Sequence, residues 1–506
     1  MKLARAGEAA LVTRRLAGRH DPVALHAALA GDGDTPLLFR RSGGRALILV
    51  DAALKLEASA QAATVEALSE GGAILLDRLA VKLADHVRTR DGRMLHLAFE
   101  RCEHPDEAVR AAAPTALELL RAMVFDLTPM DRDEPLAIVA AGIIGFDHVD
   151  MTEALPAHAP GDFPDLLFLL AETLLVIEPS GAARVLALAV GADDERIAHR
   201  QHHLAAERLA RLVERSEAAV APAIVAPPHV AAIPDLDDAA FAATVERLKR
   251  HIVAGDIFQA VPSRAFRAPC VDGPAAFRRL VAADPSAYHY SFDTGYGLLF
   301  GASPETALEL SRDDTGLTVS VSPIAGTRPR GATPDEDDRH EADLRLDTKE
   351  VAEHLMLVDL ARNDVARVCA PGTRRVARLL GVERFARVMH LVSRVEGQLG
   401  EGRDAIDAIR ACLNVGTLSG APKLRAIELI RSVEASPRGP YGGAIGWIAG
   451  DGSMDSAVVI RSALVRGGIA EVRAGAGVVA DSDPLAEAAE TRAKASAVLA
   501  ALGAAA

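Results

Sequence analysis

Apolar residues recur along the chain in two patterns, short runs typical of strands and amphipathic stretches typical of helices. The run Ala46–Leu54 predicts a buried strand, and Ile197–Arg215 has apolar residues at helical spacing among charges. Further strands are expected at Leu317–Val321, Gly442–Ile448, Ala457–Ile460 and Ala470–Ala474. Further helices are expected near Phe241–Ala254, Thr348–Val368, Ala405–Leu413, Lys423–Val433 and Leu485–Leu502. Several strands are separated only by short turns, which favours antiparallel pairing and an α+β fold over a doubly wound sheet.

A segment rich in Ala, Val and Pro interrupts these patterns between residues 216 and 238. Its prolines break regular structure: Pro222, Pro227, Pro228 and Pro234. We interpret it as a connector between an N-terminal part, residues 1–215, and a second part, residues 239–506.

Composition narrows the classes of function. The 506-residue chain has a formal net charge of −14, which argues against a nucleic-acid partner because phosphate binding requires clustered Lys and Arg. Its four cysteines form no C-x-x-C pair, so a disulfide framework or zinc cluster is not expected. No signal peptide is recognisable, and the apolar run Leu166–Ile177 is too short to span a bilayer, so a cytoplasmic location is expected.

Two carboxylate pairs have metal-site spacing. Glu350 and Glu353, and likewise Glu487 and Glu490, are three residues apart and share a helical face. If the two pairs faced each other, they would form an oxygen-rich site suited to Mg²⁺. Because E-x-x-E is also common on solvated helices, spacing alone leaves both interpretations open.

Three other motifs are weaker when considered singly. Gly475 and Gly477 precede the Glu487 helix and would let backbone N–H groups approach a carboxylate, although tight turns use glycine as often. The segment Gly416–Lys423 (GTLSGAPK) departs from a phosphate loop because Pro422 precedes its lysine. From composition, Pro323–Gly331 (PIAGTRPRG) is interpreted as a surface turn.

In combination these segments resemble chorismate-utilising enzymes, in particular the anthranilate synthase component I family. The resemblance covers nearly the whole chain and is carried by motifs in the family's order: LILVDAALKL (47–56), FPDLLFLLAETLLVIE (163–178), DIFQAVPSR (256–264), GASPE (301–305), PIAGTRPRG (323–331), EHLMLVDLARND (353–364), VMHLVSRVEG (388–397), GTLSGAPK (416–423), YGGAIGW (441–447) and AGAGVVADSDP (474–484). It implies layered antiparallel sheets flanked by helices, with chorismate and Mg²⁺ bound in a cleft.

The resemblance also assigns roles to matching residues. Glu350, Glu353, Glu487 and Glu490 would surround Mg²⁺, which would hold the ring carboxylate of chorismate. The pyruvyl carboxylate would be held by Tyr441, Arg461 and the Gly475–Gly477 backbone, with Lys494 nearby; an arginine fork matches a carboxylate. Thr327, Thr417 and Glu305 would line the site. His390, which on its own would be interpreted as a core histidine, matches the histidine associated with pyruvate loss, and Glu305 is our candidate general acid for the departing hydroxyl.

The implied reaction is ammonia attack on C2 of chorismate as the C4 hydroxyl leaves, followed by loss of pyruvate to give anthranilate. Isochorismate and salicylate synthases have a lysine base where this chain has Gln259, and glutamine cannot take a proton near neutral pH. Aminodeoxychorismate synthases have a lysine nucleophile where this chain has Ala325. No cysteine has a glutaminase context, so the family implies a separate glutamine amidotransferase subunit that supplies ammonia, in a heterodimer or heterotetramer.

A departure from the family concerns regulation. Feedback-inhibited members bind tryptophan with a Leu-Leu-Glu-Ser segment, which aligns with Leu37–Arg40, and a Pro-Tyr-Met segment, which aligns with Ala287, Tyr288 and His289. Phe39 thus replaces the glutamate that would pair the ligand's ammonium, and Arg40 beside it would repel that ammonium. Trp447 stands where the family commonly has a tyrosine near this pocket. We expect weakened or absent tryptophan inhibition.

Two alternatives remain at this point. One is an aminodeoxyisochorismate synthase that stops before pyruvate loss, which the mass of the product distinguishes. The other is a non-catalytic homologue that binds only the amidotransferase, which failure to bind chorismate with Mg²⁺ would indicate.

Overall fold

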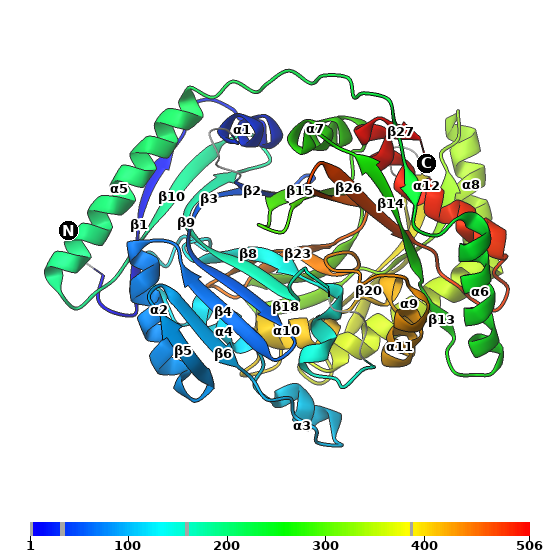
Figure 1. Ribbon diagram of the computed structural model, residues 1–506, viewed down its shortest axis with the longest axis horizontal. Helices are drawn as coiled ribbons and strands as arrows, with labels where there is room; N and C mark the ends of the chain where they lie inside the picture. Colours follow the sequence, from blue (N-terminus) through cyan, green and yellow to red (C-terminus); the bar gives the residue numbers. More distant parts are fainter. Residues whose placement is uncertain (1–3, 31–35, 157–160, 385–387, 506) are drawn as a thin grey trace.

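Most strands of the protein form one large sheet folded into two layers, and two further pairs, β11 with β27 and β13 with β22, form small sheets of their own. The computed structural model describes residues 4–30, 36–156, 161–384 and 388–505. Within these residues 23 strands join in a sheet whose pairings are antiparallel apart from β1 with β7. Figure 1 shows the two layers stacked, with helices on both outer faces. The predicted α+β fold of layered antiparallel sheets flanked by helices is confirmed.

The helices lie on the outer faces of the layers. They are α1 (Pro22–Leu29), α2 (Glu70–Lys82), α3 (Glu107–Ala112), α4 (Leu117–Phe125), α5 (Glu195–Glu217), α6 (Asp238–Val253), α7 (Gly273–Ala283), α8 (Pro334–Leu346), α9 (Thr348–Ala366), α10 (Ala405–Cys412), α11 (Lys423–Val433) and α12 (Pro484–Leu502).

The strands of the N-terminal part are β1 (Glu8–Arg15), β2 (Leu37–Arg41), β3 (Ala46–Ser59), β4 (Ala62–Ala67), β5 (Val87–Asp91), β6 (Met94–Ala98), β7 (Thr128–Pro129), β8 (Val139–Ile144), β9 (Leu166–Ile177) and β10 (Ala183–Val190). Those that follow α5 are β11 (Val230–Ala231), β12 (Ile233–Pro234), β13 (Gln259–Ala260), β14 (Ser263–Pro269), β15 (Tyr288–Asp293), β16 (Leu298–Ser303), β17 (Thr306–Asp313), β18 (Gly316–Val321), β19 (Ile324–Pro329), β20 (Arg375–Arg384), β21 (Val388–Gln398), β22 (Gly420–Ala421), β23 (Ala444–Ala449), β24 (Met454–Val458), β25 (Ser462–Arg466), β26 (Ile469–Gly475) and β27 (Ala504–Ala505).

Strand β9 connects the two layers. It pairs with β3 along its length, with β8 over its first half and with β10 over its second half. Because its partner changes midway, the sheet turns there without ending. Nearly every residue of β9 is buried, as its continuous apolar run predicts for a strand covered on both faces.

Three hydrophobic clusters hold the layers together. One lies between the layers and includes Phe39, Val139 and Ile445. A second packs α1, α5, α7 and α12 against the sheet, and a third packs α2, α4, α9 and α10. The burial of apolar surface in these clusters, worth roughly 25 cal/mol per Å², is the main stabilising contribution to this fold, whose four cysteines form no disulfide.

The predicted connector is almost free of regular structure. Helix α5 ends at Glu217, and residues 218–229 form no helix or strand before the two-residue strands β11 and β12. Figure 1 shows this segment crossing outside α1 and α7. Arg279 of α7 holds it by donating to the Val225 carbonyl at 3.0 Å. Strands pair across the predicted division, β2 with β15 and β8 with β23, so the two parts share one sheet.

Most predicted elements are confirmed to within a few residues. The largest shift is at the end of the strand expected at Ala46–Leu54, because β3 continues to Ser59. The strand expected at Ala457–Ile460 is β24, Met454–Val458. It ends early because the backbone turns just after it, where Arg461 has a left-handed φ of 50°. The segment Pro323–Gly331, interpreted as a surface turn, is instead largely strand β19, which pairs with β21. Its turn-forming residues are accommodated by an irregularity in register between Ala325 and Thr327.

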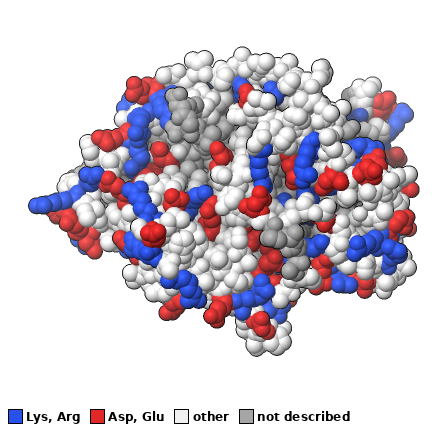
Figure 2. Space-filling view, viewed as in Figure 1, with Lys and Arg blue, Asp and Glu red and all other residues white. Residues whose placement is uncertain are grey.

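Surface charge is mixed on the face shown in Figure 2, where basic and acidic side chains are interspersed. Pairs such as Arg200 with Glu70, whose Nη2–Oε1 distance is 2.6 Å, contribute little stability each because they are exposed. No helix in the described part of the chain is long and apolar enough to cross a bilayer.

Candidate active site

The two carboxylate pairs lie on helices α9 and α12, and the structure brings them together. Asp347 caps α9 by accepting from the backbone N–H groups of Lys349 and Glu350, and Pro484 occupies the first position of α12. Burial raises the pKa values of Glu350 and Glu353, and the nearby charge of Glu490 raises both further. Since α9 and α12 are more than 100 residues apart in sequence, this convergence is a property of the tertiary fold.

Lys494 lies at the centre of these groups. Its Nζ is 2.7 Å from Oε1 of Glu490 and donates to the Gly475 carbonyl at 3.0 Å. Burial opposes ionisation of Glu490, but the Lys494 ammonium outweighs burial and lowers the pKa of that carboxyl. Lys494 thus links the carboxylate cluster to the glycine pair.

The carboxylate cluster has the chemistry of a divalent-cation site. Glu487 Oε2 is buried without a hydrogen-bond partner, and burial also raises the pKa of Glu487. A cation would relieve both costs. Within the described residues, no three His, Cys, Asp or Glu side chains are grouped so that they could hold a metal ion, and Glu490 is paired with Lys494. The four glutamates fit Mg²⁺ in the type of their ligand atoms, because this ion prefers carboxylate oxygens.

The glycine pair provides space beside the cluster. A Cβ on Gly475 would stand 3.1 Å from the Tyr441 hydroxyl, and one on Gly477 would stand 3.2 Å from Glu353 Oε1. Arg461 adjoins this space: burial lowers its pKa, and the charges of Tyr441 and Glu490 act on it. Among the described residues its guanidinium has no hydrogen bond or ion pair, so the fork remains available for a carboxylate.

His390 is a neutral base candidate. It lies on β21 opposite Thr327 of β19, with Nδ1 3.2 Å from the Gly326 carbonyl and 3.0 Å from Thr327 Oγ1. Burial lowers the pKa of His390 to about 4, aided by the positive charges of Arg461 and Lys494. Because a carbonyl only accepts, we assign the proton to Nδ1, which leaves Nε2 as the basic nitrogen.

Glu305 has the properties of a general acid. It follows β16 and accepts a 2.8 Å hydrogen bond from Thr417, which lies in the turn before β22. Burial raises the pKa of Glu305 to about 7, and the Thr417 hydrogen bond and the Lys494 charge only partly offset this. A carboxyl with this pKa is partly protonated near neutral pH, so it can donate a proton.

A pH profile tests this role. For the amination that the family resemblance implies, with free ammonia held constant, we expect the rate to fall as pH rises above about 7, because Glu305 loses its proton there. Glu305→Gln should lower the rate by about 100-fold and remove that limb of the profile. If the pH profile of Glu305→Gln, measured by chorismate consumption, still fell above about pH 7, the assignment of Glu305 as the general acid would be wrong.

The two specificity residues lie on β13 and β19. Gln259 donates from Nε2 to Glu353 Oε1 at 2.7 Å, so it orients a predicted metal ligand in addition to lacking basicity. Ala325 lies on β19, where its methyl side chain offers no nucleophile.

Sequence reasoning missed Arg438 and the pair Lys423–Asp364. The buried Arg438 guanidinium donates to the carbonyls of Leu418 and Val261 at 2.7 and 2.5 Å, and its centre is 5.7 Å from the Tyr441 ring. Lys423 Nζ is 2.9 Å from Asp364 and ties the GTLSGAPK segment to α9. The only available signal was proximity in sequence, since Arg438 is three residues before Tyr441.

The residues aligned with the tryptophan pocket lie on β2 and β15, with Ala287 just before β15. The rings of Phe39 and Tyr288 pack at an angle of 42° with centroids 5.5 Å apart, and Trp447 packs against the same cluster. Successive strand residues face opposite sides. Arg40 therefore lies on the other face, paired in register with His289. The cation on the face of Phe39 is Arg41, which corrects the predicted neighbour.

The fold and this arrangement define a chorismate-binding enzyme. The family model for chorismate binding enzymes matches residues 69–500, and the chain belongs to this family. Curated relatives include the pyocyanine-specific anthranilate synthase component 1 of Pseudomonas aeruginosa, 46% identical over 92% of this chain and 88% of that protein. Anthranilate synthase component 1 of Escherichia coli is 41% identical over 97% of this chain and 96% of that protein.

Solved structures agree on the architecture. Anthranilate synthase component I from Streptococcus pneumoniae superposes with a TM-score of 0.70 at 27% identity, covering 90% of this chain and 92% of that one. The menaquinone-specific isochorismate synthase of Escherichia coli superposes with a TM-score of 0.69 at 17% identity, covering 99% and 96%, and this supports the fold alone.

Proposed function

We propose that this chain is the large subunit of an anthranilate synthase, converting chorismate and ammonia to anthranilate and pyruvate. The observation that carries the proposal is the buried Arg461 guanidinium, which has no hydrogen bond or ion pair among the described residues and lies within range of the charges of Tyr441 and Glu490. Chorismate is a dicarboxylate, and this site offers one cationic fork and one carboxylate cluster suited to a bridging cation. The names of the curated relatives support the same activity.

In the proposed site each chain residue has a defined task. Arg461, Tyr441 and the glycine backbone bind the pyruvyl carboxylate. Glu350, Glu353, Glu487 and Glu490 would hold Mg²⁺, which when bound supplies charge neutralisation for the ring carboxylate. Glu305 donates a proton to the C4 hydroxyl, which leaves as water while ammonia adds at C2. The Nε2 of His390 then acts as the base in the step in which pyruvate departs and the ring becomes aromatic.

The source of ammonia is also part of the proposal. The name component 1 of the relatives points to a second component, and we propose a glutamine amidotransferase subunit that passes ammonia to this site. Gln259 cannot act as a base and Ala325 cannot act as a nucleophile. Ammonia needs neither group to attack, so both residues support ammonia as the attacking group.

A product assay tests the activity. Purified chain, chorismate, Mg²⁺ and excess ammonium salt at mildly alkaline pH should yield anthranilate, followed by fluorescence, and an equal amount of pyruvate. Chelation with EDTA should abolish the reaction, and added Mg²⁺ should restore it. Aminodeoxyisochorismate without pyruvate, identified by mass, would support the alternative enzyme, and no binding of chorismate with Mg²⁺ would support the non-catalytic homologue.

We also propose that tryptophan inhibits this chain weakly or not at all. Phe39 offers no carboxylate to an ammonium group, and Arg41 already pairs with Glu309 at 2.7 Å and with Asp455 at 3.3 Å on the same face. The acids nearest the aromatic cluster are therefore occupied by an internal cation.

Calorimetry with tryptophan checks the regulatory proposal. We expect no saturable heat and an unchanged rate of anthranilate formation at millimolar tryptophan. Micromolar binding together with inhibition would refute it. Chorismate titrated in the same buffer with Mg²⁺ serves as the positive control, because its site is independent of Phe39.

A further inference from the structure

A second pocket lies between α2 and α4, away from the residues of the chorismate site. Its volume is about 440 Å³, within the range of small-molecule sites. Its walls are apolar and buried: Leu54, Leu75, Leu79, Met123 and Leu170. It is therefore a hollow in the core that opens at the surface.

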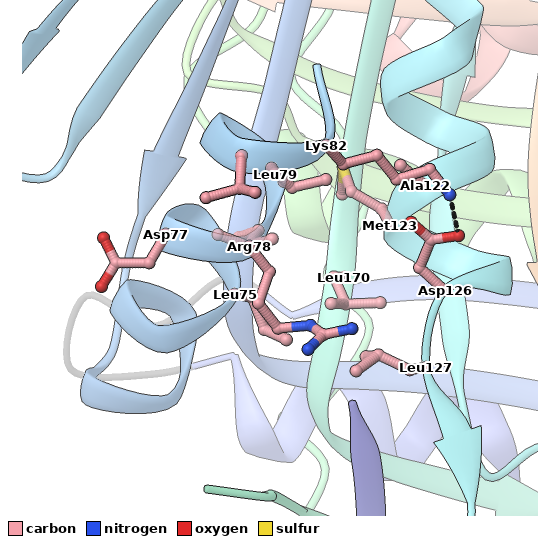
Figure 3. Close-up of a pocket in the computed structure, with 12 residues that line it drawn as sticks. Leu75, Asp77, Arg78, Leu79, Lys82, Ala122, Met123, Asp126, Leu127 and Leu170 are labelled. Carbon is pink, nitrogen blue, oxygen red and sulfur yellow. Dashed lines mark hydrogen bonds and ion pairs between the residues drawn. The ribbon is translucent and has the colours of Figure 1, made fainter. Parts of the chain in front are cut away.

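The charged groups at the mouth are paired, with one exception. Lys82 forms an ion pair with Asp126, and Asp77 pairs with Arg90. Figure 3 shows Asp77 pointing away from the pocket, whereas the Arg78 side chain extends toward Leu127. Within the part of the chain that the structure describes, Arg78 has no hydrogen bond or ion pair.

The position of Arg78 is set by the surrounding backbone. A Cβ on Gly7 would lie 3.0 Å from Arg78 Nη2, so the missing side chain of Gly7 leaves room for the guanidinium. Helix α2 is held close to β3, since a Cβ on Gly72 would stand 1.9 Å from the Ala53 carbonyl oxygen. The pocket and the Arg78 guanidinium are thus part of a closely packed framework.

We propose that this pocket binds a small organic monoanion with an apolar body, of the class of aromatic carboxylates. The apolar walls would cover the ring, and the Arg78 fork would take the carboxylate in two hydrogen bonds. The charge balance favours this class: the acids at the mouth are neutralised by Lys82 and Arg90, and Arg78 is left over. The proposal is independent of the reaction at the chorismate site.

Binding of para-bromobenzoate tests the proposal, with para-bromobenzyl alcohol as the neutral probe of the same shape. Calorimetry of the full chain should show saturable binding of the anion and binding of the alcohol that is weaker by about tenfold or more. In crystals soaked with the anion, the anomalous signal of bromine should lie between α2 and α4.

Three variants separate the possible outcomes. Arg78→Gln should weaken binding of the anion about tenfold and leave the alcohol unaffected. Arg88→Gln is the matched control, because Arg88 is exposed on β5 and likewise has no partner among the described residues. Arg461→Gln should leave binding at this pocket unchanged.

Either of two results would overturn the proposal. If Arg461→Gln rather than Arg78→Gln abolished binding, the anion would occupy the chorismate site. If the anion and the alcohol bound with equal affinity, both to the parent chain and to Arg78→Gln, Arg78 would not recognise the carboxylate. The pocket would then be an apolar surface for a protein side chain. Thermal melting of each variant verifies that it is folded.

Discussion

Replacing His390 with alanine is expected to lower anthranilate formation by about 100- to 10,000-fold, the usual contribution of a single acid–base group. The reason is that burial keeps the imidazole neutral and the Gly326 carbonyl holds the proton on Nδ1, so Nε2 is the base that the variant loses. Amination does not require this base, so aminodeoxyisochorismate should accumulate. Mass spectrometry of the products and a coupled pyruvate assay measure both steps.

His26→Ala is the matched control for this experiment. His26 is also buried, burial lowers its pKa to about 4 as well, and its Nε2 is 2.9 Å from the Pro36 carbonyl, but it belongs to α1 and not to the site. The His26→Ala variant should be less stable than the parent chain, but its turnover per folded molecule should be unchanged. If His390→Ala formed anthranilate at the parental rate, the assignment of the pyruvate-loss step to His390 would be wrong.

Arg438→Met is expected to have the largest effect on stability, lowering the free energy of unfolding by about 3–5 kcal/mol, because it breaks a buried ion pair by removing one partner. Arg438 and Glu434 are both nearly inaccessible, with Nη2 2.6 Å from Oε1, and the Leu418 and Val261 carbonyls would also lose their donor. The segments around Thr417 and Gln259 should loosen, so KM for chorismate should rise. Denaturant unfolding followed by the fluorescence of Trp447, the sole tryptophan, measures the first effect.

Two further variants test this explanation. Arg425→Met removes an exposed arginine that pairs with Glu428, and it should change the free energy of unfolding by less than about 0.5 kcal/mol. Arg438→Lys should recover little of the lost stability. A lysine ammonium lacks the planar fork of a guanidinium, so it cannot reach Glu434 and both carbonyls at once. A loss below about 1 kcal/mol in Arg438→Met would mean that the buried pair is nearly balanced by its desolvation cost.

Several features could be predicted from the sequence because short-range rules control them. The bounds of α12 follow from Pro484 at its start and Gly503 after its end, where φ is 87°. Helical spacing alone places Glu350 and Glu353 on one face of α9, and Glu487 and Glu490 on one face of α12. The family motifs carried the rest of the site, since several short segments in a fixed order specify a fold far better than each does singly.

The tertiary structure decided what depends on contacts between distant segments. Composition predicted a turn at Pro323–Gly331, but pairing with β21 made most of it a strand, because tertiary hydrogen bonds outweigh weak local preferences. Strand alternation placed Arg41, not Arg40, on the face of Phe39. That Arg461 and Arg78 have no partner among the residues that the structure describes has no sequence signature, because whether a guanidinium pairs with a carboxylate depends on which distant residues the fold brings near it.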